Sequence, residues 1–444
     1  MATKVKAIDQ NFFGTGSIKA ILLKIAPPVM LAQLIQALYN IVDSFFVGRY
    51  SADALTAVTV IYPIQIVIVA LAVGTGVGVN TYMARKYAQG EIESANYTAG
   101  TGMVLAVLSW IALAVCTTLI MRPYVMTSAT EPAAINQAVI YGNIVCIGSL
   151  GTFLESNWSK VHQSRGNMKL PMIAQVAGAL TNVVFDPILI FGIGPVPEMG
   201  IAGAAYATVL GQFVSAIIVG IRGFQKPPRI SEIPHYASRI YKYGYSSILM
   251  QVLYTVYIVA LNMILAGFSD AAVTVLGLYY KAQSFFFIPL FGLQTCIVPV
   301  LSFNYTRRSF DRCRELMRDS IIVSLSLMAV GIVCFIFLPE QLMMIFSNSD
   351  EVIAIGRIAF PIIGLSFASA VFSLIMPTFF QAIGEGLKSL LLSLTRQIFC
   401  LVPIFWLLSL IGLNYTWIAF PVSETIAGAV GIILYKRETA KWKL

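Results

Sequence analysis

LLKIAPPVMLAQLIQALYNIVDSFFVG, residues 22–48, is the stretch that decides the fold class. As an α-helix it would be roughly 40 Å long, which is enough to cross a bilayer. It nevertheless contains a carboxylate, Asp43, and a charged side chain near the bilayer centre costs ~2.5–3.5 kcal/mol on insertion scales. The sequence therefore predicts a membrane-spanning helix whose acidic residue faces protein or water rather than lipid.

One face of this helix is polar. Its polar residues are spaced three or four positions apart and so share that face: Gln36, Tyr39, Asn40 and Asp43. The opposite side consists of isoleucine, leucine, valine and phenylalanine. We interpret the stripe as a functional face inside a helical bundle. The alternative is a packed helix whose polar groups only satisfy one another.

The composition extends this prediction to the whole chain. Of 444 residues, 58% are hydrophobic and 11% are charged, and the mean hydropathy is +0.81. These values indicate an all-α polytopic membrane protein and exclude an ordinary soluble domain. The apolar runs predict twelve spans, near residues 21–48, 54–84, 95–122, 134–162, 170–191, 200–223, 240–267, 272–303, 314–338, 352–380, 388–411 and 416–436.

Cysteine usage and charge placement narrow the class further. The six cysteines form no CxxC pair, so neither a disulfide framework nor a metal cluster is indicated, and no cofactor is expected. No cleavable signal peptide is expected. About 25 of the 29 basic residues, Lys388 and Arg396 among them, fall on one side if the spans alternate. This predicts a multi-pass protein of the plasma or inner membrane with cytoplasmic termini, and it explains the net charge of +9 without a nucleic-acid partner.

The two halves of the chain repeat each other. One ungapped shift aligns Tyr39 with Tyr257, Ser51 with Ser269, and Gln163-x-x-Gly166 with Gln381-x-x-Gly384. We expect an N-terminal six-helix bundle over residues 1–224, a cytoplasmic linker over 225–239 and a C-terminal six-helix bundle over 240–444. Such parallel repeats are typical of transporters that alternate access to a site between their halves.

Several segments carry a resemblance to a known family. They are YNIVDSFFVGRYSADAL at 39–55, RGNMKLPM at 165–172, NVVFDPILIFG at 182–192, GIAGAAYAT at 200–208, YYKAQSFFFIPLFGLQTCIVPVLSFNY at 279–305, QAIGEGLKS at 381–389 and PVSE at 421–424. Together, in a two-times-six layout, they resemble the multidrug and toxic compound extrusion (MATE) transporters over essentially the whole chain.

The resemblance implies a function as well as a fold. It implies an antiporter, not an enzyme, that exports amphipathic and often cationic drugs against an inward flow of protons or sodium. The chain is most similar to the branch whose coupling acids lie in the N-terminal half. There, the matching residues form the cation site: Tyr39, Asp43, Asn182 and Asp186. The chain departs from the family where an expected Arg-x-x-Gly reads Gln163-x-x-Gly166, and it lacks the C-terminal acidic pair of another branch.

The positions of Asp43 and Asp186 also argue for a coupling site. Asp186 lies about 22 Å along its helix from Pro171, and Asp43 is close to the end of the first helix at Gly48. Both are expected in the outer half of the membrane. Two such carboxylates share a proton or a cation more easily than they both remain charged. We favour a proton and keep sodium as a possibility. A static hydrogen-bonded pair is the alternative.

Further polar residues are candidates for a substrate cavity: Gln36, Asn40, Asn157, Tyr280, Lys281 and Gln283. Lys281 is expected near the midplane, where an ammonium needs an acid, carbonyl groups or water. It either sets substrate selectivity or tethers two helices. Pro27 and Pro28 are expected to form a hinge near the inner end of the first helix.

Partners and rival functions follow from the same features. We expect small-molecule substrates, a lipid bilayer around a monomer, and no nucleic acid. A lipid-linked oligosaccharide flippase of the same superfamily is the runner-up, with Lys281 as its main support. A membrane enzyme lacks support, because the sequence has no HExxH, GxSxG or nucleotide-binding loop.

Overall fold

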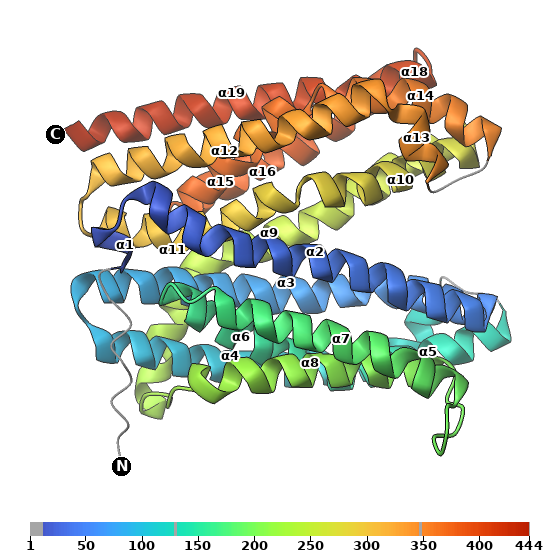
Figure 1. The fold of residues 1–444 in the computed structure, drawn as a ribbon, viewed down its shortest axis with the longest axis horizontal. Coiled ribbons are helices and arrows are strands. Elements are labelled where there is room, and N and C mark those ends of the chain that lie inside the picture. The colour runs from blue at the N-terminus through green and yellow to red at the C-terminus, as the bar shows by residue number, and fades with distance from the viewer. Residues whose placement is uncertain (1–11, 128–130, 346–348, 444) are drawn as a thin grey trace. The chain divides into compact units, whose positions relative to one another are not determined.

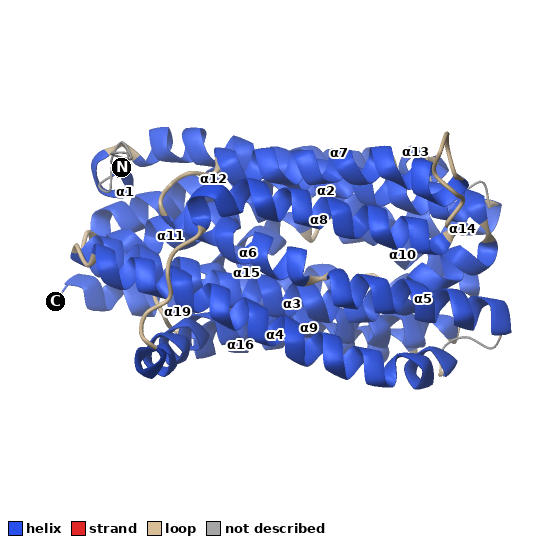
Figure 2. Cartoon of the chain, turned by 90° about the horizontal axis from the view of Figure 1, so that it is seen from below, coloured by secondary structure: helices blue, strands red, loops and turns tan. Residues whose placement is uncertain are grey.

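The fold is built from helices. The computed structural model describes residues 12–127, 131–345 and 349–443, and in these ranges it contains helices and connecting loops but no strand (Figures 1 and 2). Within the described ranges, eleven helices are long and apolar enough to cross a membrane. Counted as one span, the pair α14 (Asp350–Gly364) and α15 (Phe367–Ala382), bent by 55°, makes a twelfth. The predicted all-α, twelve-span architecture is confirmed.

The bounds of the helices follow the predicted ranges with several breaks. The first half contains α1 (Phe12–Thr15), α2 (Ile18–Tyr50), α3 (Ala52–Gln89), α4 (Ile92–Met126), α5 (Pro132–Gly148), α6 (Leu150–Ser164), α7 (Lys169–Phe191) and α8 (Ile201–Gly223). The second contains a 3-10 turn (Ile230–Glu232), α9 (Ile233–Ala266), α10 (Asp270–Phe286), α11 (Ile288–Thr306), α12 (Phe310–Phe337), α13 (Pro339–Met344), α14 (Asp350–Gly364), α15 (Phe367–Ala382), α16 (Gly386–Leu394), a π-helical segment (Thr395–Leu401), α17 (Val402–Ser409), α18 (Leu413–Thr416), α19 (Ala419–Ala440) and a 3-10 turn (Lys441–Lys443).

Three local predictions need correction. The linker predicted over 225–239 is shorter, because α9 already begins at Ile233, with Pro234 at a position where a helix tolerates proline. The predicted helix 272–303 is interrupted at Phe287, between α10 and α11. The first predicted helix begins at Ile18 rather than at residue 21, so Pro27 and Pro28 lie inside α2.

The chain divides into two compact units. Among the described residues, unit 1 comprises 12–15 and 27–248, and unit 2 comprises 16–26 and 249–443. One boundary therefore lies inside α2, directly before Pro27, and the other lies inside α9. The start of α2 is tied to unit 2 by Arg312, whose Nη2 donates to the carbonyl oxygen of Gly16 at 2.7 Å.

Equivalent positions in the two halves adopt the same local structure. Ser51 and Ser269 both cap a helix N-terminus, and each hydroxyl accepts from the amide three residues later, at 3.0 and 3.2 Å. Gly166 and Gly384 both take positive φ, 78° and 88°, just after α6 and α15. Left-handed backbone favours glycine at both positions. The repeat found in the sequence therefore extends to caps and turns.

Each unit is packed around its own interior. In unit 1, small residues such as Ala54, Ala57 and Ala204 let the helices approach closely. Unit 2 has an aromatic interior, where Phe335 lies 4.8 Å from Phe360 and 4.7 Å from Phe367 between ring centroids. Many leucines and isoleucines remain exposed on the outer surfaces, as expected of helices whose outer solvent is lipid.

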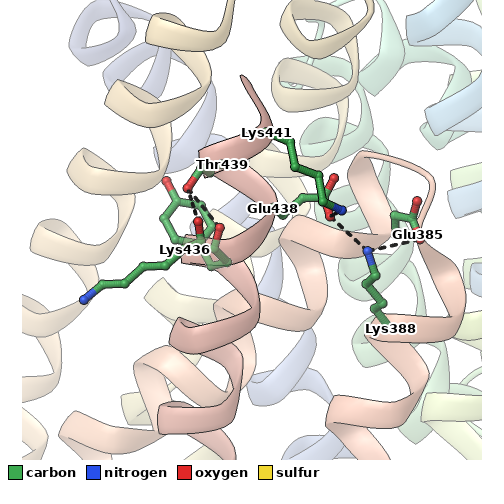
Figure 3. A network of polar contacts seen from close by, with 7 residues as sticks. Glu385, Lys388, Lys436, Glu438, Thr439 and Lys441 are labelled. Carbon is green, nitrogen blue, oxygen red and sulfur yellow. Dashed lines mark hydrogen bonds and ion pairs between the residues drawn. The ribbon is translucent and has the colours of Figure 1, made fainter. Parts of the chain in front are cut away.

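Charged residues gather at one end of α16 and α19. Lys388 Nζ lies 2.9 Å from Glu438 Oε2 and 3.5 Å from Glu385 Oε2, and Lys441 Nζ lies 3.0 Å from the same Glu438 oxygen (Figure 3). The sequence prediction grouped Arg396 with these terminal charges, but the structure places it elsewhere. It lies about ten residues into the span Gly386–Ser409, roughly 15 Å from its start.

Candidate functional site

The central feature of unit 1 is a pair of carboxyl groups. The carboxyl groups of Asp43 of α2 and Asp186 of α7 lie close enough to interact with each other. Two neighbouring carboxyl groups in buried surroundings cannot both stay ionised cheaply, so such a pair favours uptake of one proton. The structure thus brings together the two acidic residues that the sequence singled out, and the pair can hold at least one exchangeable proton.

Asp186 and its helix neighbour Asn182 form the buried side of the site. Asp186 is 0% exposed and Asn182 is 2% exposed. Asn182 Nδ2 donates to Asp186 Oδ1 at 3.3 Å and to Thr208 Oγ1 of α8 at 3.4 Å. The spacing of one helical turn places the amide over the carboxyl group. Asn182 therefore holds Asp186 in one orientation and connects α7 to α8.

The acidic pair also presents unused acceptors. Apart from the contact between the two carboxyl groups, no described residue donates a hydrogen bond to Asp43 Oδ1, Asp186 Oδ2 or Asn182 Oδ1. Buried polar atoms normally have partners, so unused oxygens of this kind fit a bound proton, water or cation. Oxygen atoms are also the ligands that hard cations prefer. Among the described residues, no group of three His, Cys, Asp or Glu side chains is gathered as a metal site.

Two tyrosines complete the surroundings of the pair. Tyr39 of α2 and Tyr141 of α5 both interact electrostatically with Asp43 and Asp186. Tyr141 is 2% exposed, and Gln65 of α3 donates to its hydroxyl at 3.2 Å. The sequence prediction named Tyr39 but missed Tyr141. Gln65 was visible as a polar residue in an apolar span that recurs in the repeat, whereas Tyr141 had no distinguishing pattern.

Close packing of α7 on α8 sets the position of Asn182. A Cβ atom added to Gly211 of α8 would lie 2.6 Å from the carbonyl oxygen of Gly178. Only glycine permits this approach. One turn further along, Ser215 Oγ donates to the carbonyl oxygen of Ala174 at 2.8 Å. These contacts hold the two helices close enough for Asn182 to reach Thr208.

The remaining cavity candidates of unit 1 lie outside the acidic pair. Gln36 and Asn40 are exposed on α2. Asn157 of α6 is 3% exposed, and neither polar atom of its side chain has a partner among the described residues. It packs against Gly102 of α4, where an added Cβ atom would collide with Asn157 Oδ1. Their roles in a substrate cavity stay predictions.

The candidates of unit 2 lie on α10. Tyr280 belongs to a cluster of rings, with Tyr254 and Tyr257 at centroid distances of 6.2 and 6.3 Å. Its neighbour Lys281 has an exposed side chain, and no ion pair within the described part of the chain includes it. Gln283 is half-buried. The selectivity role predicted for Lys281 therefore remains a prediction.

Unit 2 also contains a buried ion pair that the sequence prediction missed. Arg396 Nη1 lies 3.1 Å from Glu424 Oε1 of α19, and the two side chains are 13% and 10% exposed. Ser373 of α15 donates to the other Glu424 oxygen. The sequence prediction had counted Arg396 among the basic residues on one side of the membrane and had given Glu424 no partner. The signal that could have identified Arg396 is its depth in the eleventh predicted span.

Comparison with protein families gives one clear match. The MatE family model matches residues 28–188 and 246–407. These two ranges cover most of the chain and lie at corresponding positions in its halves. The matched region includes both carboxyl groups of unit 1 and Arg396 of unit 2.

Individual relatives match at low identity over long stretches. A probable multidrug resistance protein NorM from Thermotoga maritima is 27% identical over 361 residues, which is 78% of this chain and 75% of that protein. An FAD transporter from Shewanella oneidensis is 21% identical over 437 residues, 97% of each chain. A multidrug export protein MepA from Staphylococcus saprophyticus is 21% identical over 435 residues, 95% of this chain and 94% of that protein.

Solved structures match over almost the full length. A multidrug resistance transporter of the MATE family in an outward-facing conformation superposes with a TM-score of 0.92 at 21% identity, over 99% of both chains. A transporter of the MOP superfamily from Pyrococcus furiosus, described as having a binding pocket of reverse polarity, superposes with a TM-score of 0.91 at 22% identity, over 100% of both chains. At these identities the likeness concerns the fold.

Proposed function

This chain belongs to the MatE family of membrane transporters, and from that premise we propose that it exports amphipathic, often cationic, compounds in exchange for an inward flow of protons or sodium ions. The observation that carries the coupling is the contact between Asp43 and Asp186. The proposal of drug export is supported by relatives named for multidrug resistance or export. Those names favour drug export over the flippase alternative.

The geometry suggests how one ion could drive export. Asp43 belongs to α2, which passes from unit 2 into unit 1, whereas Asp186 is fixed on α7 by Asn182. Adding or removing a proton changes how strongly the two carboxyl groups hold α2 against α7. A two-state element biased by one ion is what coupling requires. Tyr39 lies on the same face of α2 and would move with Asp43.

Proton and sodium coupling make different demands on the site. Two neighbouring buried carboxyl groups favour uptake of one proton over two separate charges, which supports proton coupling. Sodium would need several oxygen ligands at once. The unused oxygens of Asp43, Asn182 and Asp186 could supply three of them. We favour the proton because the carboxyl contact needs no rearrangement to hold it.

Transport by purified protein in liposomes tests the proposal. Rhodamine 123, an amphipathic cationic dye, is supplied on one side, and its movement is followed by fluorescence under an imposed pH gradient or an imposed sodium gradient. We expect dye movement under the pH gradient that stops when a protonophore collapses it. Dye movement under the sodium gradient alone would show that sodium, and not the proton, is the coupling ion. Dye movement under neither gradient would contradict coupled export. We expect the positive-inside orientation, with cytoplasmic termini, to be visible in protease accessibility of the same liposomes.

A further inference from the structure

The ion pair of unit 2 lies inside the candidate membrane spans, where charged side chains are energetically unfavourable. Arg396 and Glu424 are both inside candidate spans and face each other at 3.1 Å. Ionised side chains at such depth are rare in membrane helices and usually mark a site rather than a support. Replacing a buried ion pair by apolar residues is often neutral or stabilising. Stability alone therefore does not explain why this helix contains an arginine.

The helix that carries Arg396 is locally irregular. Residues Thr395–Leu401 form a π-helical segment between α16 and α17. A π-helical turn contains an extra residue, so it redirects the side chains on either side of it, and such turns are frequent at functional sites. Gln397, the next residue, is 4% exposed, and its Oε1 has no partner among the described residues. The segment thus presents an arginine and an unsatisfied amide in the interior of unit 2.

Aromatic side chains surround the arginine. Arg396 interacts electrostatically with Tyr257, Tyr279 and Tyr280. The rings of Tyr257 and Tyr280 lie edge to face with centroids 6.3 Å apart, and the buried Tyr280 hydroxyl has no hydrogen-bond partner among the described residues. Tyr279 packs edge-on against Phe420 of α19, with ring centroids 5.2 Å apart. Rings and hydroxyls beside a guanidinium form surroundings in which a planar aromatic anion can stack and accept hydrogen bonds.

The guanidinium has donors to spare. Of its five N–H groups, one makes a hydrogen bond within the described part of the chain, from Nη1 to Glu424 Oε1. The second Glu424 oxygen is occupied by Ser373, so this carboxylate does not form the two-pronged pair that arginine makes best. The remaining donors are available to a second carboxylate. The Arg396 side chain is 13% exposed, so it is not completely enclosed by protein.

We infer that Arg396, Tyr257 and Tyr280 form a ligand site in unit 2 for the carboxylate of an aromatic compound, with Glu424 as the internal counter-ion that the ligand displaces or shares. This inference rests on the proposed export function, because it makes the ligand a transported compound. It adds a substrate class, aromatic compounds with a free carboxylate, to the cationic compounds proposed above.

The sequence repeat allows equivalent tyrosine positions in the two halves to be compared. Tyr257 occupies the position in the second half that Tyr39 occupies in the first. Tyr39 has two carboxyl groups as its electrostatic neighbours, whereas Tyr257 has Arg396 and Glu424. Equivalent interior positions thus combine a tyrosine with acidic groups in unit 1 and with an arginine in unit 2. The first arrangement suits a proton or cation, and the second suits an anion.

Equilibrium binding of two matched dyes tests the site. Rhodamine 110 has a free aromatic carboxylate, and rhodamine 123 is its methyl ester. Fluorescence anisotropy with the purified full-length protein gives the ratio of their affinities. We expect Arg396→Gln to lower the preference for rhodamine 110 over rhodamine 123 by about tenfold or more, since hydrogen bonds to a charged group are lost. Arg357→Gln is the matched control, because Arg357 forms an exposed ion pair with Glu340 at 2.5 Å, and it should leave the ratio unchanged.

A competition on the wild-type protein decides the matter even if Arg396→Gln does not fold. Benzoate should displace rhodamine 110, and benzamide, which has the same ring without the charge, should not. An unchanged ratio in folded Arg396→Gln, or equal displacement by benzoate and benzamide, would overturn the site. Gradient-driven movement of rhodamine 123 is measured separately. If rhodamine 123 does not move under a gradient but Arg396→Gln lowers the affinity ratio of the two dyes, drug export is overturned and the carboxylate site is retained.

Discussion

The carboxyl group of Asp43 on α2 interacts with that of Asp186 on α7, and Asp186 is fully buried. The two residues come from helices far apart in the sequence, yet each has its position set by a separate cause. Asp186 is held by Asn182 and by the close packing of α7 on α8. Asp43 is carried by a helix that contains two prolines and crosses between units. The contact thus joins the fixed carboxyl group of Asp186 to that of Asp43, which lies on a helix with a weakened backbone.

Removing either carboxyl group should uncouple transport. Asn has nearly the same shape as Asp but cannot exchange a proton near neutral pH, so we expect Asp43→Asn and Asp186→Asn each to lower gradient-driven dye movement by at least about 100-fold, a loss in the range seen when an essential group is removed. The measurement is initial rate in liposomes, with thermal unfolding to verify folding. Asp311→Asn, at a side chain that is 99% exposed, should keep the wild-type rate. A wild-type rate in either buried variant would remove that residue from the coupling site.

The packing of α7 on α8 gives a prediction about stability. Gly211→Ala places a Cβ atom 2.6 Å from the Gly178 carbonyl oxygen, so the helices must separate. We expect a loss of about 1–3 kcal/mol in unfolding free energy, as for other overpacked sites. Transport should fall as well, because Thr208 would move away from Asn182.

Gly277→Ala is the matched control for that substitution. Gly277 lies within α10, and a Cβ atom there meets no other atom within 4 Å. Since alanine favours helix over glycine by up to about 1 kcal/mol, this variant should be as stable as the wild type or slightly more so. Thermal unfolding in detergent measures both variants. Equal melting temperatures for the two alanine variants would show that the close approach of α7 and α8 is not required.

Substitutions in the charge network at the ends of α16 and α19 should lower the unfolding free energy less than Gly211→Ala does. Glu438 accepts from both Lys388 and Lys441 (Figure 3), so Glu438→Gln leaves two lysines facing a neutral group. We expect a loss of about 1 kcal/mol or less, since the lysines remain hydrated, and a smaller difference from wild type at high salt. Glu385→Gln, at a side chain that is 48% exposed, should cost less. A larger effect at Glu385 than at Glu438 would contradict this account of the network.

The comparison between sequence and structure shows what patterns can determine. Apolar length predicted the twelve spans, and charge in an apolar span singled out Asp43 and Asp186, which the structure brings together. Both signals arise from the cost of polar groups in lipid. The spacing of residues fixes which face of a helix is polar. It does not fix which other helix lies nearby, so Tyr141 could not be identified until the structure showed α5 packed against α3.

The features of unit 2 were harder to predict for a different reason. A π-helical turn has no composition signal, because it depends on how neighbouring helices accommodate an extra residue. Counting Arg396 among surface charges followed the general tendency of arginine, which its contact with Glu424 overrides. The interruption at Phe287 between α10 and α11 was likewise hidden inside a continuous apolar run.

The last prediction concerns Pro27 and Pro28. Both lie inside α2, and the boundary between the two units falls directly before Pro27. Pro27 lacks the N–H that a helix would direct at the carbonyl group of Leu23, and Pro28 lacks its own N–H. The backbone of α2 is therefore weakest where the helix passes from one unit to the other. We expect Pro27→Ala with Pro28→Ala to stiffen this joint and to slow turnover more than it weakens equilibrium dye binding.

Stability separates this effect from simple damage to the fold. Alanine favours a helix interior over proline by about 3 kcal/mol per residue in model helices, so the double variant should unfold at the wild-type temperature or above it. Pro63→Ala is the matched control, since Pro63 is also inside a helix, α3, but lies wholly within unit 1. Its turnover should match the wild type. If the double variant turns over at the wild-type rate, α2 does not bend at these prolines during transport, and the coupling movement must arise elsewhere along the helix.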